Sequence, residues 1–103
     1  MIFNCSIPAT STVQRDDHDV RITRWDFEPG AATGWHRHDW SYVVVMLTDA
    51  IMRVHDGSQI SEFARKAGDT YHRAAGVEHD VANGSPTPMA FVEIEIKRSE
   101  AGA

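Results

Sequence analysis

Two short segments of the chain carry histidines at spacings that suit a metal ion. The first segment holds His36 and His38, and the second, about forty residues later, holds His79. In a β-strand, side chains two residues apart point to the same face, so His36 and His38 present two imidazoles side by side. A third imidazole from a neighbouring strand would complete a set of three nitrogen ligands. The sequence therefore predicts a three-histidine metal site.

Three imidazoles define what such a site could do chemically. They are neutral ligands, so a divalent ion keeps its full charge and stays a strong Lewis acid, with coordination positions open to water or substrate. Imidazole suits several transition metals, and the residues leave iron, zinc, nickel, manganese and copper as alternatives.

The same strand phase points to a further chemical group. If the alternation continues beyond His38, Trp40 and Tyr42 look to the same side as the two histidines. Tyr42 is therefore the predicted catalytic residue, as a hydrogen-bond donor to an oxygen at the metal or as an acid–base group. Direct ligation by its phenolate is disfavoured, because free tyrosine has a pKa of about 10.

The elements that must position these residues are short strands. Segments rich in β-branched and aromatic residues are bounded by turn residues, and no window shows helical periodicity over three turns. Residues 41–48 form the strongest predicted strand, whereas Glu93 and Glu95 alternate with apolar residues near the end of the chain and are expected on a solvated sheet face. Seven or eight strands with frequent turns indicate an all-β sandwich or barrel. The predicted strands are 20–27, 41–48, 51–55, 59–65, 70–73, 79–82 and 89–97.

Length and composition restrict the classes of protein to which the chain can belong. The 103 residues suffice for one domain, with 42% hydrophobic and 24% charged residues. We expect an N-terminal arm at 1–19 that is available to pack on a second subunit, a barrel at 20–98, and a flexible C-terminal tail at 99–103. The net charge of −5 disfavours a nucleic-acid partner. The lone Cys5, the lack of an apolar signal segment and the shortness of the apolar runs favour a cytoplasmic protein without a membrane partner.

The two histidine segments resemble the two conserved motifs of the cupin superfamily. The first motif spans 30–57, with His36 and His38 inside it and Asp56-Gly57 at its end. The second runs from Gly68 through Gly76 and His79 to Asn83, with Ala74 where a proline is usual. Together they cover residues 30–83, about half the chain. The runs around His36 and His79 further resemble small bacterial cupins associated with beta-alanine degradation.

The resemblance implies a fold and a ligand set. The fold is a single-domain cupin, which is a double-stranded β-helix or jelly-roll barrel, and the ligands are His36, His38 and His79. One departure matters, because Tyr42 and Val43 stand where the motif usually supplies a glutamate ligand. In such a barrel the position of His72 often points inward, so His72 is a candidate fourth ligand or a residue that supports the ligands.

Several functions fit this site. The first is a small metalloenzyme acting on a small molecule, with dioxygenase-like chemistry favoured because three-histidine iron sites occur in cupin-like thiol and diketone dioxygenases. Isomerase, lyase or hydrolase chemistry on another ion stays open. The alternative is a non-enzymatic small-molecule binder or sensor, and a structural protein with a vestigial site is the third reading. We also expect a homodimer, since a small open barrel leaves sheet edges to cover.

Overall fold

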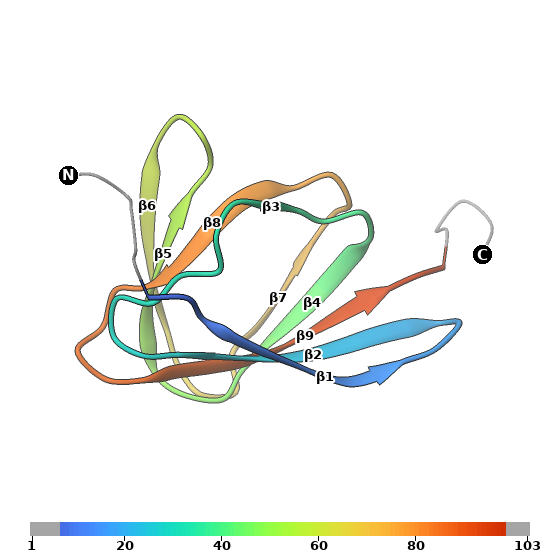
Figure 1. The fold of residues 1–103 in the computed structure, drawn as a ribbon, viewed down its shortest axis with the longest axis horizontal. Coiled ribbons are helices and arrows are strands. Elements are labelled where there is room, and N and C mark those ends of the chain that lie inside the picture. Colours follow the sequence, from blue (N-terminus) through green and yellow to red (C-terminus); the bar gives the residue numbers. More distant parts are fainter. Residues whose placement is uncertain (1–6, 99–103) are drawn as a thin grey trace.

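Nine strands in two antiparallel sheets make up the protein, shown as a computed structural model in which residues 7–98 are described (Figure 1). The first sheet has the order β1-β2-β9-β4-β7 and the second the order β3-β8-β5-β6. No segment within 7–98 forms a helix that could cross a membrane. The bounds are β1 Thr10–Asp16, β2 Val20–Phe27, β3 His36–Arg37, β4 Ser41–Met46, β5 Ala50–His55, β6 Ile60–Arg65, β7 Thr70–Arg73, β8 Glu78–Asn83 and β9 Met89–Ile96.

The core lies between the two sheets, where one face of β4, β5, β8 and β9 carries buried residues. On β4 the inward residues Tyr42, Val44 and Met46 are each about 1% exposed. They meet Met52 and Val81 from the second sheet and a cluster that includes Phe27, Met89 and Phe91. Burial of these large apolar side chains is the main favourable contribution to folding. The core therefore fixes which face of each strand points inward, and so which polar residues reach the interior.

The expected all-β barrel is confirmed, and most strands begin and end within two residues of their predicted limits. Strands 20–27 and 70–73 have the predicted bounds. The expected arm at 1–19 differs from the structure, because residues 10–16 form β1, which pairs with β2 from Thr10↔Asp26 to Asp16↔Arg21. Every residue of β1 is exposed, so no apolar face marked this strand in the sequence. Residues 1–6 and the predicted tail at 99–103 lie outside the described residues.

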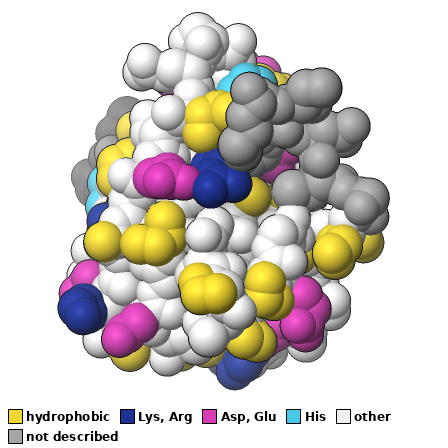
Figure 2. Space-filling view, turned by 90° about the vertical axis from the view of Figure 1, so that its left-hand side faces the viewer, with side chains coloured by type: hydrophobic (Ala, Val, Ile, Leu, Met, Phe, Trp, Pro, Cys, Tyr) yellow, Lys and Arg dark blue, Asp and Glu magenta, His cyan; other side chains and the backbone are white. Residues whose placement is uncertain are grey.

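The outer face of the five-stranded sheet carries a central row of apolar residues. Ile94 on β9 lies opposite Ile22 on one side and Val43 on the other, and Val92 lies opposite Val45. These side chains are half-buried and point away from the core. Figure 2 looks at another side of the molecule, where apolar side chains are separated by charged and other residues. The apolar row of the five-stranded sheet is therefore a distinct surface feature.

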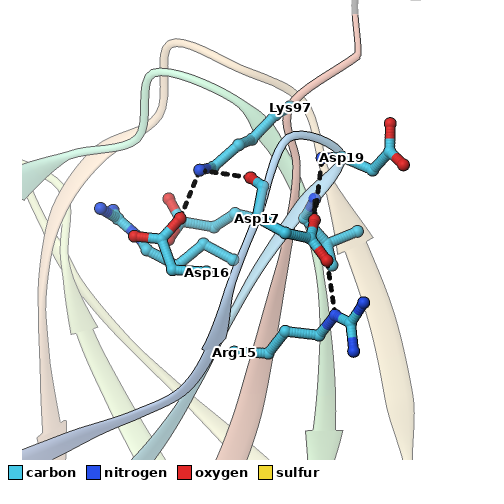
Figure 3. A network of polar contacts seen from close by, with 8 residues as sticks. Arg15, Asp16, Asp17, Asp19 and Lys97 are labelled. Atoms are coloured by element: carbon cyan, nitrogen blue, oxygen red, sulfur yellow. Dashed lines mark hydrogen bonds and ion pairs between the residues drawn. The ribbon is translucent and has the colours of Figure 1, made fainter.

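The turn between β1 and β2 is attached to the end of β9 by a polar network (Figure 3). Asp17 Oδ1 accepts hydrogen bonds from the backbone amides of Asp19 and Val20, both at 2.9 Å. Lys97 Nζ pairs with the carboxylate of Asp16 and donates to the Asp17 carbonyl oxygen at 2.8 Å. Because β1 is an edge strand with no buried face, this network adds to its pairing with β2 in holding the turn end of β1 to the rest of the sheet.

Candidate metal centre

Three imidazoles converge in the interior between the two sheets. His36 on β3 lies directly opposite His79 on β8, so the two side chains share one face. His38 follows β3, and its backbone amide donates to the Val77 carbonyl oxygen at 2.9 Å, which continues the pairing. The Nε2 atom of His38 lies 2.9 Å from Nε2 of His36 and 3.2 Å from Nε2 of His79. The structure thus brings the three sequence-predicted ligands together.

These separations fit an ion bound by three nitrogens on one side. With metal–nitrogen bonds of about 2.1 Å, neighbouring ligand nitrogens are about 3.0 Å apart at a 90° angle and about 3.4 Å apart at the tetrahedral angle. The two observed separations, 2.9 Å and 3.2 Å, lie close to that range. All three Nε2 atoms therefore face one point that an ion could occupy.

The loop before β3 orients His36. The Gly34 carbonyl oxygen lies 2.9 Å from His36 Nδ1 and can only accept, so Nδ1 carries the proton. Nε2 is then left with a free lone pair, as a metal ligand requires. Gly34 has a φ of 86°, which an L-residue rarely adopts, and this conformation turns its carbonyl back onto the imidazole. The local backbone therefore selects the ligating tautomer of His36.

His38 and His79 are buried and held neutral. They are 4% and 6% exposed. Burial, with a smaller contribution from the neighbouring His36, lowers the pKa of His38 to about 4 and that of His79 to about 3. Since a ligating imidazole must be unprotonated, both are ready to bind a cation near neutral pH. The Nδ1 atom of His79 has no hydrogen-bond partner in the structure.

Tyr42 packs against one of the ligands. Its ring is stacked on the imidazole of His38, with centroids 3.9 Å apart and an interplanar angle of 23°. Its hydroxyl is buried without a hydrogen-bond partner, and burial raises the pKa of this phenol well above its usual range. The group is therefore a neutral donor and not a phenolate.

Two carboxylates face the side of His38 that is turned away from the other histidines. Glu93 Oε1 lies 3.7 Å and Glu95 Oε2 lies 4.0 Å from His38 Nδ1. Both residues belong to β9 and are buried, at 8% and 4% exposed as whole residues. Arg21 Nε donates to Glu95 Oε1 at 2.8 Å. Burial, together with the neighbouring Glu95, raises the pKa of Glu93 to about 7.

A pocket of about 220 Å³ opens beside the histidines. Its rim includes Ser11 and Val13 of β1, and its wall includes Trp25 of β2, whose Nε1 atom is buried without a hydrogen-bond partner. A second hollow of about 450 Å³, lined by Trp40 and the end of β9 among others, contains none of the three histidines. The smaller pocket is therefore the one through which a small molecule would reach the site. The side chains that line it are Ser11, Val13, Arg21, Thr23, Trp25, His36, Arg37, His38, Glu93 and Glu95.

Two residues expected at the site, Trp40 from the strand phase and His72 from the family resemblance, lie elsewhere. The chain bends at 39–40, so Trp40 leaves the alternation, and its indole contacts Arg21 and Lys97 instead. The structure does not bring His72 to the triad either. His72 is exposed and pairs with Val43, on the face of the sheet opposite to Tyr42. The inward position of β7 belongs to its neighbour Arg73, which lies opposite Tyr42.

The buried pair Glu93 and Glu95 differs from the expectation of a solvated sheet face. Their spacing in the sequence could have predicted their burial, because residues two apart in a strand share one face. Glu93 and Glu95 share the face of Met89 and Phe91, the largest apolar residues of β9. The opposite phase, which includes Val92 and Ile94, forms the half-buried outer face. On this strand Val92 and Ile94 point outward, whereas the inward row begins with the core residues Met89 and Phe91 and ends with the two carboxylates at the site.

Comparisons with known proteins agree with this fold. The family model described as a cupin domain matches residues 23–95. The chain belongs to the cupin family.

Individual relatives cover nearly the whole chain. The Pseudomonas aeruginosa protein named beta-alanine degradation protein BauB is 47% identical over 89 residues, which is 86% of this chain and 94% of that protein. The crystal structure of a cupin domain from Bordetella pertussis has a TM-score of 0.86 at 43% identity and covers 89% of this chain and 96% of its own. A Klebsiella pneumoniae protein with a double-stranded β-helix domain has a TM-score of 0.74 at 21% identity, over 91% of this chain and 81% of its own, and shares the fold. The resemblance to cupins of beta-alanine degradation is therefore confirmed at the level of sequence similarity.

Proposed function

We propose that this cupin binds a divalent transition metal through His36, His38 and His79. The convergence of their Nε2 atoms at 2.9 Å and 3.2 Å carries the proposal. The neutrality of the two buried imidazoles supports it. Iron, zinc, nickel, manganese and copper all accept such ligands.

We further propose that the protein is a metalloenzyme acting on a small molecule, with dioxygenase-like chemistry favoured. An ion held by three neutral imidazoles polarises a bound oxygen atom and, if it is iron, supports the activation of dioxygen. No carboxylate follows His38 at the ligand position usual in the family, and this absence favours the three-histidine class of site. In this reading Tyr42 is the catalytic side chain, because its neutral hydroxyl is free to donate a proton or a hydrogen bond.

The size of the pocket and the sequence relative favour a small polar substrate. A volume of about 220 Å³ holds a molecule of metabolite size. The name of the Pseudomonas aeruginosa relative refers to beta-alanine degradation. We therefore propose β-amino acid derivatives, small thiols and diketones as the first compounds to assay. A shift in melting temperature without product formation would instead favour the alternative, a non-enzymatic binder or sensor.

Elemental analysis of protein purified without an affinity tag tests the proposal. We expect close to one metal ion per chain, and loss of that ion in the double variant His36→Ala/His79→Ala. His72→Ala is the matched control, since His72 is exposed on the outer face, and it should keep the ion. Wild-type protein that holds no metal after reloading with iron, zinc, nickel, manganese or copper would overturn the proposal. Oxygen consumption by the iron-loaded protein then tests the dioxygenase reading.

We also propose a homodimer formed through the outer face of the five-stranded sheet. The half-buried row that includes Ile22, Val43 and Ile94 supports this, because a second copy would remove it from water. Light scattering at micromolar concentration should give twice the chain mass, and Ile94→Lys should give a folded monomer. A wild-type protein with the mass of one chain would contradict the dimer.

A cytoplasmic location completes the proposal. The presence of a single cysteine, Cys5, supports a reducing compartment. Cell fractionation tests it, and recovery of the protein outside the cytoplasm would contradict it.

A further inference from the structure

We propose that Glu93 is a positioning residue for the metal site, acting through His38 from the side opposite the ion. The family usually places a glutamate among the ligands, and this chain has Tyr42 and Val43 at those positions. The inference is that Glu93 of β9 supplies a carboxylate that contacts the ligating residue His38 and does not contact the ion. It rests on the proposed metal-binding function.

The two nitrogens of His38 face different partners. Nε2 faces His36 and His79, at 2.9 Å and 3.2 Å, whereas Nδ1 faces the Glu93 carboxylate at 3.7 Å. Since the two nitrogens lie on opposite sides of the imidazole ring, Glu93 cannot join the ligands while His38 binds through Nε2. The Glu93 carboxylate lies instead on the Nδ1 side of His38, where a carboxylate commonly accepts a hydrogen bond from the N–H of a metal-binding histidine.

Glu93 also lacks a competing ion-pair partner. The neighbouring Glu95 is bound by Arg21 at 2.8 Å, and the side chain of Glu95 is 6% exposed. The side chain of Glu93 is 11% exposed, and within residues 7–98 its only ion-pair contact is with His38. A buried carboxylate with a single partner is costly unless a positive charge lies nearby. A dication on the far side of His38 would provide that charge.

The other two histidines show why the position matters. The Nδ1 proton of His36 is held by the Gly34 carbonyl oxygen, and Nδ1 of His79 has no partner. Within residues 7–98, Glu93 is therefore the carboxylate nearest to a free Nδ1 of the triad, and unlike Glu95, which is 4.0 Å from the same Nδ1, it is not bound by an arginine. It can orient the His38 ring and raise its basicity. The contact of 3.7 Å is longer than a hydrogen bond, so we infer that it shortens when His38 takes up an ion.

Cobalt binding by the whole chain tests this inference. Metal-free wild type and Glu93→Gln are titrated with Co²⁺ in competition with a chelator, and the visible absorption bands of the bound ion are recorded. Glutamine keeps the shape of the side chain but removes its charge. We expect the Kd for Co²⁺ to rise by about 10- to 100-fold, as is typical when a partner of a ligating histidine is lost, and the bands to shift. Glu93→Asp should restore part of the affinity.

Glu95→Gln is the matched control, because Glu95 is the next inward carboxylate on β9 but is already bound by Arg21. It should change the Kd by less than threefold. In zinc-loaded protein, nitrogen NMR should place the proton of His38 on Nδ1, with a resonance that moves in Glu93→Gln.

Three outcomes separate the two proposals. Equal affinity and equal spectra for wild type and Glu93→Gln would overturn the role of Glu93 and leave the metal site standing. An effect of Glu95→Gln as large as that of Glu93→Gln would also overturn it. Wild-type protein that binds no cobalt would overturn the metal site itself.

Discussion

The phenol ring of Tyr42 lies nearly parallel to the imidazole of His38, with ring centroids 3.9 Å apart, and its hydroxyl is buried without a hydrogen-bond partner. The stacking explains how Tyr42 can belong both to the core and to the site. Its ring packs in the interior, while its hydroxyl has no partner and can donate a hydrogen bond. A buried polar group without a partner destabilises the folded state. Such a group is found in native structures where a bound ligand or an ordered water supplies its hydrogen-bond partner.

Replacing Tyr42 by phenylalanine separates these two roles. We expect Tyr42→Phe to raise the free energy of unfolding of the metal-free protein by about 1 kcal/mol, because the unpaired hydroxyl is removed and the stack is kept. Turnover, where it is found, should fall. Tyr71→Phe is the control, since the Tyr71 hydroxyl donates to Met52 Sδ at 3.4 Å, and it should give no gain in stability. Urea denaturation measures both, and a clear loss of stability in Tyr42→Phe would mean that the hydroxyl has a partner.

The conformation of Gly34 gives a second prediction. Its φ of 86° disfavours any side chain, although the structure leaves open space where a Cβ would lie. Gly34→Ala should therefore lose about 1–2 kcal/mol of stability from backbone strain alone. Because the Gly34 carbonyl oxygen orients His36, the Kd for Co²⁺ should also rise, by about tenfold.

Gly30→Ala is a matched control for that strain. Gly30 has a φ of 81° and equally open space, but its carbonyl does not contact a histidine of the site. It should lose the same stability and keep the metal affinity. If the two variants bind Co²⁺ equally, the orientation of His36 by Gly34 does not matter for the site.

The pKa of Glu93 predicts how stability depends on pH. Burial and the neighbouring Glu95 raise this pKa from 4.5 to about 7, so the folded state holds a proton that the unfolded state releases between these values. The wild type should therefore lose stability as pH rises from 4.5 to 7, by about 3 kcal/mol at 1.36 kcal/mol per pKa unit. In Glu93→Gln this loss is absent.

The measurement is the difference in free energy of unfolding between Glu93→Gln and the wild type, both free of metal. It should grow by about 3 kcal/mol between pH 4.5 and 7 and stay level above pH 7. The lowered pKa values of His38 and His79 have the opposite sign, since they remove stability as pH falls below 6.5. The contribution of His79 is common to both proteins and cancels in the difference, whereas a change in the pKa of His38, which contacts Glu93, adds to the difference at low pH. A difference that does not vary with pH would show that Glu93 titrates normally.

The histidine triad could be predicted from the sequence because the strand geometry of His36 and His38 is local and because the segment around His79 resembles the second cupin motif. His36 and His38 need only the two-residue period of a strand, and the turn glycines mark where His79 begins its own strand. Strands 20–27 and 70–73 were predicted for the same reason, since their residues and bounding turns are distinctive.

Other features depend on tertiary structure that local pattern does not encode. A shift of one residue in register decides that Arg73, and not His72, lies opposite Tyr42. The bend at 39–40 removes Trp40 from the phase of the histidines. Glu93 faces inward because it shares the phase of Met89 and Phe91, which pack in the core, whereas its charge alone favours the solvated face.

The contact of Lys97 with the β1–β2 turn gives the last prediction. Lys97 pairs with Asp16 and donates to the Asp17 carbonyl oxygen, and β1 has no buried face of its own. Lys97→Met should keep the length of the side chain but release the turn. The amides of β1 should then exchange with solvent several-fold faster, while global stability falls by about 1 kcal/mol or less. Since Ser11 and Val13 of β1 border the pocket, its rim should loosen as well.

Arg98→Met is the control, because Arg98 forms only an exposed pair with Asp19, at 3.2 Å. Its effect on exchange in β1 should be small. Hydrogen exchange followed by mass spectrometry compares the two variants over 10–16. Unchanged exchange of β1 in Lys97→Met would show that pairing with β2 alone holds the strand in place, and that the rim of the pocket does not depend on this network.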